Sequence, residues 1–545
     1  MPKEYRNMDH LIREYLLPVR IVLTEGEVKD AELLLHTAAE QVGLGVQTYV
    51  RLRGKCRIVL DFGKEIRGGL RIVAGRGTDC VPMRLRLGES VNECLSELGQ
   101  KGSTNNHALR DISVQLPMLS DQQFFDSGFR FACIDFPEEN TDVCLRSVNA
   151  VYIRSDREQL GSFVCSDPLI NRIYQVAART VRLCSSDYIW DGIKRDRLVW
   201  MGDLYPEITS FLSLCADDGC VPRSLDFVKN ETPLPRWMND FPMYSMWWII
   251  ILEEYYRLTG NAEYVLEQRG YFEKLIGQID GCIAENGDFD FGMNFVDWPT
   301  HEHADEPEGV RSLCKLCARS AANLEKLYGI RTGCADRIAE KLSRKGAEVT
   351  EKKQIVALKY LSGTQLSERE RKILAEGGAK GFSTFMSYFL LTALSTVEGE
   401  ETALAAMKEY YGGMLALGAT SFWEDFDVEW MKGAVCPIDR PLRPGEKDIH
   451  GDFGRYCYIG YRHSLCHGWS AGVVPFLVKR VLGVEIVEAG YKKVRITPRL
   501  GGLEFVEASV PTPHGVLRIS CRKEGDKTVV EAKAPKGVEV ITAEN

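Results

Sequence analysis

Asp191-Gly-Ile-Lys-Arg-Asp-Arg-Leu-Val-Trp-Met-Gly-Asp203 is the stretch around which the chain is organised. Three aspartates, three cations and one indole fall within its thirteen residues, and an apolar run, Leu-Val-Trp-Met, interrupts the charges. A helix from Asp196 onward would place Trp200 and Asp203 on the face of Asp196, whereas Asp191 belongs to the preceding loop. Carboxylates beside an aromatic ring suit a sugar site, but an Arg–Asp network that only stabilises the fold uses the same residues.

Two arginines flank the central aspartate of this stretch. Arg195 and Arg197 favour ionised carboxylates, because a nearby cation lowers the pKa of a carboxyl group. A general acid at Asp196 needs the opposite influence, from another carboxylate or from an apolar wall. The stretch alone therefore leaves open how Asp196 would hold a proton near neutral pH.

A second constellation is Gly418-Ala-Thr-Ser-Phe-Trp-Glu-Asp-Phe-Asp427. Glu424 stands between Trp423 and Phe426, and a carboxylate among aromatic rings tends to have a raised pKa. That favours a catalytic interpretation. An exposed glutamate beside aromatic residues of the core is the alternative.

Both stretches resemble the two catalytic motifs of the bacterial alpha-L-rhamnosidases, glycoside hydrolase family 78. In that family a loop aspartate leads into Arg-Asp/Glu-Arg and then Trp-x-Gly-Asp, and the second motif is Gly-Ala-Thr-x-x-Trp-Glu. The resemblance implies that Asp196 is the general acid and Glu424 the general base of an inverting hydrolase that removes terminal alpha-L-rhamnose. Many members have Glu at the acid position, where this chain has Asp. The spacing leaves open whether Lys194 or Arg195 corresponds to the family's arginine.

Further residues are candidates for contact with the sugar. Trp247 lies in a helix start, Tyr244-Ser-Met-Trp-Trp248, that resembles a family element, although core packing explains one of its two tryptophans equally well. A loop rich in Gly, Asn and Pro places Asp297 and Trp298 where ligand contacts are common. The resemblance implies a substrate-contacting histidine in a late helix, best matched by His467. The full set of predicted binding residues is Asp191, Arg195, Arg197, Trp200, Asp203, Trp247, Asp297, Trp298, Trp423 and His467.

We expect neither a metal ion nor a cofactor in this site, because the protons of a hydrolysis can move between side chains. His463 and His467 have a spacing that metal ligands can use, but no Glu follows His463 as in zinc proteases. His301-Glu-His303 is more typical of a solvated loop.

The periodicity of the sequence changes twice. Residues 1–160 alternate as strands do, with an unclear and partly helical first fifty. A helix start at Ser166-Asp-Pro168 opens about 300 residues of helical pattern, in which residues 346–380 are polar enough to be a solvated excursion. Strand patterns return after Gly483.

This order predicts a multidomain, mainly α chain. Periodicity alone does not separate a barrel of helical hairpins from a solenoid or a bundle. The resemblance implies an (α/α)6 barrel flanked by N-terminal and C-terminal β-sandwich units. The expected domains are an N-terminal sandwich over 1–160, a catalytic barrel over 161–483 and a C-terminal sandwich over 484–545.

Composition limits the partners. The 545 residues carry a formal net charge of −9, which disfavours nucleic acid and anionic membranes. No apolar run reaches the roughly 18 residues of a membrane span, and the first twenty residues lack a signal-peptide core. The 17 scattered cysteines indicate buried free thiols. We therefore expect a cytoplasmic protein acting on a rhamnose-containing glycoside, with a homodimer left open.

Two other functions fit the same residues. A catalytically impaired barrel that only binds sugar is suggested by Asp in place of Glu at the acid position. A barrel hydrolase for a different deoxy- or uronic-acid sugar is the other alternative.

Overall fold

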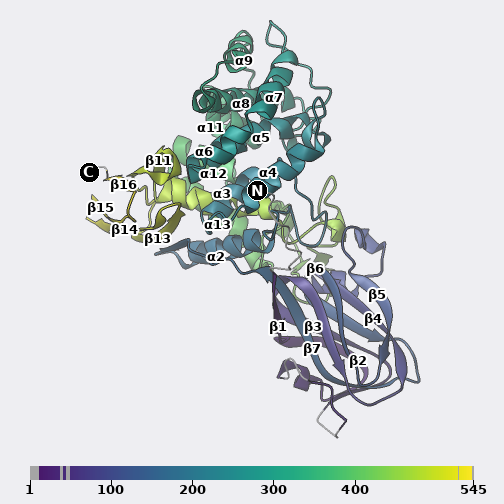
Figure 1. Ribbon diagram of the computed structural model, residues 1–545. Coiled ribbons are helices and arrows are strands. Elements are labelled where there is room, and N and C mark those ends of the chain that lie inside the picture. Colours follow the sequence, from purple (N-terminus) through teal and green to yellow (C-terminus); the bar gives the residue numbers. More distant parts are fainter. Residues whose placement is uncertain (1–10, 37–40, 45–48, 526, 543–545) are drawn as a thin grey trace.

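The computed structural model describes residues 11–36, 41–44, 49–525 and 527–542 (Figure 1). The N-terminal part is a sheet of seven strands in the order β1-β7-β3-β6-β4-β5, with β2 paired to β3. All neighbouring strands are antiparallel except β3 and β7. The strands are β1 (Leu11–Leu16), β2 (Arg20–Lys29), β3 (Val50–Ala74), β4 (Cys80–Gly88), β5 (Asp111–Pro117), β6 (Asp121–Phe136) and β7 (Asp142–Ser155).

The long strand β3 bends where its pairing register shifts. One shift lies next to Gly68, which has φ 149° and stands so close to β7 that a Cβ would meet the carbonyl oxygen of Val151 at 1.8 Å. Only glycine fits there without moving the neighbouring strand. The expectation of partly helical structure in the first fifty residues is met in the described part only by a short 3-10 helix, Ala31–Leu35, which follows the strands β1 and β2. Residues 1–10, 37–40 and 45–48 of that expectation lie outside the described residues.

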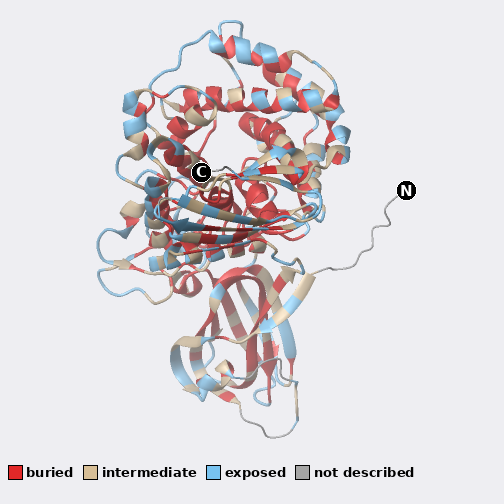
Figure 2. Cartoon of the chain, turned by 90° about the vertical axis from the view of Figure 1, so that its left-hand side faces the viewer, coloured by how far each residue is buried: buried red, intermediate tan, exposed pale blue. Residues whose placement is uncertain are grey.

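The helical part begins with α2 (Pro168–Leu183), as the sequence predicts. The Asp167 side chain accepts hydrogen bonds from the backbone N–H groups of Leu169, at 2.9 Å, and Ile170, at 3.3 Å, and Pro168 occupies the first turn. The apolar positions of α2 face the core, in which strands and helices share one continuous cluster. Figure 2 shows these buried residues gathered inside the helical part and inside the N-terminal sheet.

Further helices follow and pack on one another, most closely α5 on α8, α12 on α13, α8 on α9, and α10 on both α8 and α12. They are α3 (Leu204–Leu212), α4 (Cys220–Glu231), α5 (Pro242–Thr259), α6 (Ala262–Glu267), α7 (Arg269–Gly281), α8 (Glu306–Tyr328), α9 (Cys334–Ser343), α10 (Lys353–Leu361), α11 (Glu368–Ala375), α12 (Ser387–Glu398) and α13 (Glu400–Ala416).

Two helical expectations are wrong. Residues 346–380 are no solvated excursion, because α10 is buried between α8 and α12 and the Lys359 ammonium pairs with Glu370 inside the protein. The single helix expected over 464–482 is instead a 3-10 segment, Gly468–Gly472, followed by α14 (Val473–Phe476) and a π-turn, Leu477–Val481.

Strands return at the C-terminal end, where one of them pairs with a strand that precedes the helices in the chain. One sheet has the order β15-β14-β13-β8 and a smaller one the order β11-β12-β16, and both lie against the helical part (Figure 1). Thus strand-rich parts stand at both ends of a helical tract, as the changes of period predicted. The strands are β8 (Ser162–Cys165), β11 (Val484–Glu488), β12 (Lys493–Ile496), β13 (Phe505–Thr512), β14 (Gly515–Glu524), β15 (Lys527–Lys533) and β16 (Glu539–Thr542).

The cysteines meet the expectation of buried free thiols. All 17 cysteines are free thiols, and most of them are buried. None of the helices in the described ranges is long and apolar enough to cross a lipid bilayer.

Candidate active site

A cavity of about 200 Å³ brings together segments that are far apart in the chain. This volume lies below the roughly 300–1,000 Å³ of pockets for drug-sized ligands and suits a small ligand. Carboxylates, two arginines and one histidine meet aromatic residues on its wall. The lining residues are Asp191, Arg195, Asp196, Trp200, Asp203, Phe241, Tyr244, Trp298, Glu424, Cys457, Tyr458, Arg462, His467 and Trp469.

The stretch from 191 to 203 enters this cavity as a loop. The helix expected from Asp196 is wrong, since α3 begins only at Leu204. The Asp191 carboxylate accepts a hydrogen bond from the Leu198 N–H at 2.8 Å and so closes the loop on itself. Asp196 and Arg197 have φ values of 57° and 54°, a left-handed conformation that residues other than glycine rarely adopt.

Arg195 bridges the two carboxylates that the motifs single out. Its Nη1 lies 3.1 Å from Oδ1 of Asp196, and its Nη2 donates to Oε1 of Glu424. Burial disfavours the charged form of Arg195, but Glu424 and Asp196 outweigh it and raise the pKa, so the guanidinium stays charged. Lys194 points away from the cavity, which identifies Arg195 as the arginine of this site.

Glu424 is held on the floor of the cavity. Its Oε2 accepts a hydrogen bond from the Ser464 N–H at 2.9 Å, and its backbone carbonyl accepts from the Trp469 indole at 2.9 Å. Burial raises the pKa of Glu424, while Arg195 and the Ser464 N–H oppose this shift. Burial outweighs these opposing contacts, so the pKa of Glu424 lies above the ordinary value of a glutamate.

His467 stands among three carboxyl groups. Its Nε2 lies 3.7 Å from Asp191 Oδ2, 3.8 Å from Asp203 Oδ2 and 3.7 Å from Glu424 Oε1. Burial, followed by Arg195 and His463, lowers the pKa of His467 well below its usual value, so the ring is neutral. Burial and neighbouring carboxylates raise the pKa values of Asp191 and Asp203 well above the usual range. Asp191 and Asp203 therefore hold a proton more readily than ordinary aspartates do.

The histidine is not part of a late helix. His467 has extended backbone geometry, with φ −136°, directly before the 3-10 segment. His463 accepts a hydrogen bond from the Asp425 N–H at 2.9 Å and does not line the cavity. The two rings therefore share no helix face that could hold a metal ion.

One group beside the cavity was missed by the sequence reasoning. Among the residues that the structure describes, neither carboxylate oxygen of Glu207 has a hydrogen-bond partner, and burial raises the pKa of Glu207 well above the usual value. Ligand atoms of Asp203, Glu207 and His467 lie within 4.8 Å of one another, a spacing that could hold a metal ion. A glutamate within the apolar start of α3, one turn after Asp203, is the signal that marks it in the sequence.

The aromatic candidates divide into two groups. Trp200 and Trp298 line the cavity, together with Phe241 and Tyr244, which were not predicted. Trp200 meets Tyr244 edge to face, at a ring separation of 6.2 Å, and the Tyr244 hydroxyl bonds to the Asp203 carboxyl.

Two predicted tryptophans lie in the core instead. Trp247 is 2% exposed and packs on Tyr205 and Phe389, and Trp423 is 1% exposed and packs on Phe426. Neither lines the cavity, so an aromatic residue next to a motif residue is not by itself a wall of the site.

Two predicted binding residues, Asp297 and Arg197, lie outside the lining of the cavity. Asp297 accepts hydrogen bonds from the backbone N–H of Trp298, at 2.8 Å, and from the Ser383 hydroxyl. Arg197 faces the N-terminal sheet, where it donates to the backbone carbonyl of Asp126 at 2.6 Å. Neither side chain lines the cavity.

Two segments of the chain match known family models. Residues 158–321 match the bacterial alpha-L-rhamnosidase six-hairpin glycosidase domain, and residues 483–542 match the bacterial alpha-L-rhamnosidase C-terminal domain. No curated protein matches the chain.

Solved structures share the fold over most of the chain. The GH78 family rhamnosidase of Bacillus sp. GL1 has a TM-score of 0.74 and 22% identity, over 92% of this chain and 55% of that chain. A rhamnosidase from Klebsiella oxytoca with rhamnose bound has a TM-score of 0.66 and 18% identity, over 86% and 95%. The Streptomyces avermitilis alpha-L-rhamnosidase complexed with L-rhamnose has 0.67 and 15%, over 92% and 50%. The chain thus spans about half the length of the first and third of these proteins.

Proposed function

We propose that this chain, whose six-hairpin and C-terminal domains are those of the bacterial alpha-L-rhamnosidases, is a glycoside hydrolase that removes terminal alpha-L-rhamnose. The observation that carries the proposal is the bridge made by Arg195 between Asp196 and Glu424 on the wall of a small cavity. A pair of carboxyl groups is what hydrolysis of a glycosidic bond requires. The rhamnose bound to the Klebsiella oxytoca and Streptomyces avermitilis proteins supports the choice of sugar.

The two carboxyl groups have different surroundings, which suits different roles. The Asp196 side chain is 16% exposed and that of Glu424 only 4%. We assign Asp196 as the general acid, because the leaving oxygen and its aglycone depart toward solvent. Glu424 is the general base that takes a proton from the attacking water, and Arg195 favours the ionised state that a base needs.

We propose inversion of configuration at the anomeric carbon. In an inverting enzyme water fits between the two carboxyl groups, which are then roughly 6.5–9.5 Å apart. The water attacks the anomeric carbon as its proton passes to Glu424, and the bond to the leaving oxygen breaks as that oxygen takes the proton of Asp196. Free rhamnose and the protonated aglycone are the products.

The remaining polar groups would hold the sugar. Protonated Asp191 and Asp203 can donate to ring hydroxyls, and neutral His467 offers a further polar contact among them. Trp200 and Trp298 would pack on the apolar faces of the ring and on the 6-methyl group of a deoxy sugar. Trp423, Asp297 and Arg197 act from outside the cavity, and Trp247 contributes to the core.

The finer architecture belongs to the same proposal. The helices would form an (α/α)6 barrel between two β-sandwich units, with domains over 1–160, 161–483 and 484–545. We propose a reaction without metal or cofactor, and a reducing, cytoplasmic location that suits the 17 free thiols.

Hydrolysis of an aryl alpha-L-rhamnoside tests the function. We expect release of the nitrophenol from nitrophenyl alpha-L-rhamnoside, and proton NMR of the first product should show beta-rhamnose if the reaction inverts. Glu424→Gln is the matched control for contaminating activity. Binding of rhamnose by calorimetry without turnover would instead indicate a sugar-binding protein. Turnover of another glycoside in a panel would indicate a hydrolase for a different sugar.

A further inference from the structure

The residue before Arg195 lies in a separate, closed cluster of charges. Lys194 is buried, and its ammonium Nζ lies 2.8 Å from Glu89 Oε2 and 3.1 Å from Glu93 Oε1. The same group donates to the backbone carbonyls of Tyr461, at 3.0 Å, and His463, at 2.7 Å. We propose that Lys194 is a positioning residue that ties the N-terminal sheet to both catalytic carboxyl groups, an inference that rests on the proposed function.

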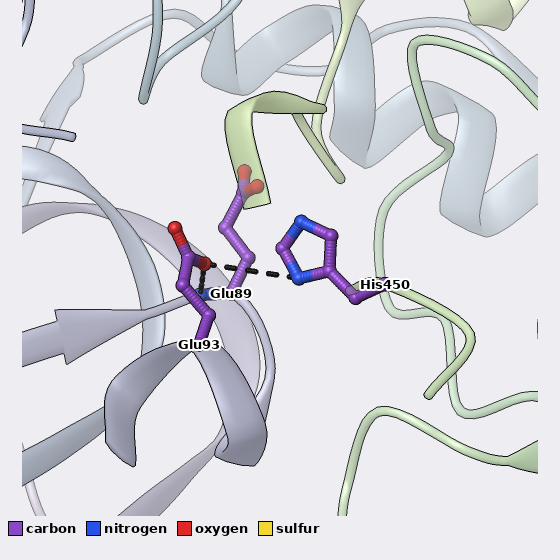
Figure 3. Close-up of side chains that lie close together, drawn as sticks. All are labelled: Glu89, Glu93 and His450. Carbon is purple, nitrogen blue, oxygen red and sulfur yellow. Dashed lines mark hydrogen bonds and ion pairs between the residues drawn. The ribbon is translucent and has the colours of Figure 1, made fainter. Parts of the chain in front are cut away.

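The acceptors of Lys194 belong to the N-terminal part of the chain. Glu89 follows β4 directly, and Glu93 lies in the short helix α1 (Val91–Leu95). The backbone N–H of Glu89 donates to Glu93 Oε2 at 2.8 Å, which holds the Glu93 carboxylate against the end of β4. Figure 3 shows the side chains of Glu89 and Glu93 beside His450, with the Glu93 carboxylate facing the imidazole ring.

A metal ion is the obvious alternative occupant of this cluster. Ligand atoms of Glu89, Glu93 and His450 lie within 4.8 Å of one another. The Lys194 ammonium, however, already contacts both carboxylates. Both ring nitrogens of His450 are also engaged, Nδ1 with Ser90 Oγ at 2.8 Å and Nε2 with the His463 carbonyl at 2.9 Å. The lysine supplies the positive charge that a metal ion would otherwise bring.

The backbone connects Lys194 directly to Asp196, the proposed general acid. Lys194 is one peptide bond from Arg195 and two from Asp196, in the segment where Asp196 and Arg197 have left-handed backbone conformations. Such a conformation persists only when surrounding contacts hold it. Anchoring of Lys194 therefore fixes where Arg195 and Asp196 point.

A second loop, residues 461–465, connects the cluster to Glu424, the proposed general base. The carbonyls that Lys194 binds precede Ser464, whose N–H donates to Glu424 Oε2 at 2.9 Å. Glu89 accepts from the Ser464 hydroxyl at 3.2 Å and from the Leu465 N–H at 2.6 Å. One ammonium and one carboxylate thus hold both loops against the N-terminal sheet, which makes that sheet part of the active-site scaffold.

Lys194→Met in the full chain tests the role, because methionine keeps much of the side-chain volume and removes the charge. We expect kcat on the aryl rhamnoside to fall about 10²-fold, as a displacement of about 1 Å in a catalytic group can cause, with KM changed less than about threefold. Lys341→Met is the matched control, because Lys341 is equally buried, lies 2.9 Å from Asp280 Oδ1, and is remote from the cavity. It should lower the melting temperature while kcat stays within about twofold of wild type.

A double-mutant cycle and hydrogen exchange separate positioning from general stability. Glu93→Gln should lower kcat less than Lys194→Met, and the double variant should be no worse than Lys194→Met alone, because one contact is shared. Glu93→Gln also serves if Lys194→Met does not fold. Backbone hydrogen exchange should become faster at 191–203 and 461–466 in both variants but not in Lys341→Met.

Hydrogen exchange needs no substrate, so it tests the clamp even if the chain proves inactive on rhamnosides. The inference is overturned if folded Lys194→Met keeps kcat within about threefold of wild type. Unchanged exchange at 461–466 in that variant would overturn it equally.

Discussion

Lys194 and Arg195 are neighbours in the sequence, yet their cations enter opposite environments. The Lys194 cluster is closed, and its ammonium is surrounded by two carboxylates and two carbonyls. Arg195 also meets two carboxylates, but it does so on the wall of a cavity of about 200 Å³. Burial and charge are common to both clusters, so neither property marks the reactive one.

The difference lies in unused hydrogen-bonding capacity. In the closed cluster both nitrogens of His450 have partners. Beside the cavity, Nδ1 of His467 and both oxygens of Glu207 have none within the described part of the chain. Buried polar groups without partners are costly, and proteins keep them mainly where a ligand or a reaction uses them. An opening together with unpaired polar atoms is therefore the better sign of a functional site.

The strongest test of this contrast removes the carboxyl groups that Arg195 bridges. We expect Asp196→Asn and Glu424→Gln each to lower kcat on an aryl rhamnoside by about 10²-fold or more, as loss of a general acid or base does. Folding should survive, because each change is nearly isosteric, and circular dichroism with thermal melting checks this.

One outcome would contradict the assignment of Asp196 as the general acid. If Asp196→Asn keeps near-full activity while Asp191→Asn or Asp203→Asn abolishes it, the aspartate with the larger effect is the acid. An activated substrate with a good leaving group should also rescue loss of the true acid but not loss of Glu424, because protonation of the leaving oxygen then matters less.

A smaller effect is expected from the aromatic walls. Trp200→Ala and Trp298→Ala should each raise the Kd for rhamnose by about tenfold, which corresponds to about 1.4 kcal/mol of lost contact. Trp247→Phe is the control, because its ring lies in the core outside the cavity. It should lower the melting temperature and leave the Kd unchanged, as calorimetry can show. If only Trp247→Phe raised the Kd, Trp247 would contact the sugar, and Trp200 and Trp298 would not.

The last effect concerns a buried carboxyl group that adjoins Trp298. Asp297 accepts two hydrogen bonds, and burial raises its pKa to about 7 from an ordinary value of 3.8. The folded state therefore binds this proton more tightly than the unfolded state. Its contribution to stability is fully present below the ordinary pKa and is lost as pH rises toward 7, by up to about 1.4 kcal/mol per pH unit.

Asp297→Asn removes that dependence. The melting temperature of wild type relative to Asp297→Asn should fall, by a few degrees, between pH 4.5 and pH 7.5, because only wild type gives up the proton. Calorimetric melting of both proteins across this range measures the difference. A constant difference would show that Asp297 is ionised throughout.

Much of the architecture follows from the sequence because its signals are local. Asp167 and Pro168 mark the start of α2, and alternating or helical periods mark the strand-rich ends and the helical tract. Two short motifs likewise identified Asp196 and Glu424, although they lie 228 residues apart (424 − 196).

The failures depend on contacts between distant residues. Leu-Val-Trp-Met fits a helix start, but the hydrogen bond from Leu198 to Asp191 holds the segment as a loop. The polar composition of residues 346–380 suggested a solvated segment, but Lys359 pairs with Glu370 inside the protein. Nothing in the sequence tells Trp200, on the cavity wall, from Trp247 in the core, since the choice depends on which residues pack opposite each ring.

The pairing of β8 with β13 has a consequence for biosynthesis. Phe163 lies opposite Ala508, so the strand that leads into the first long helix finds its partner only after some 345 further residues (508 − 163) have been made. During translation this strand leaves the ribosome with an unpaired edge, and unpaired edges invite association with other chains. A nascent chain that has not yet reached residue 505 therefore leaves the edge of β8 that later pairs with β13 exposed.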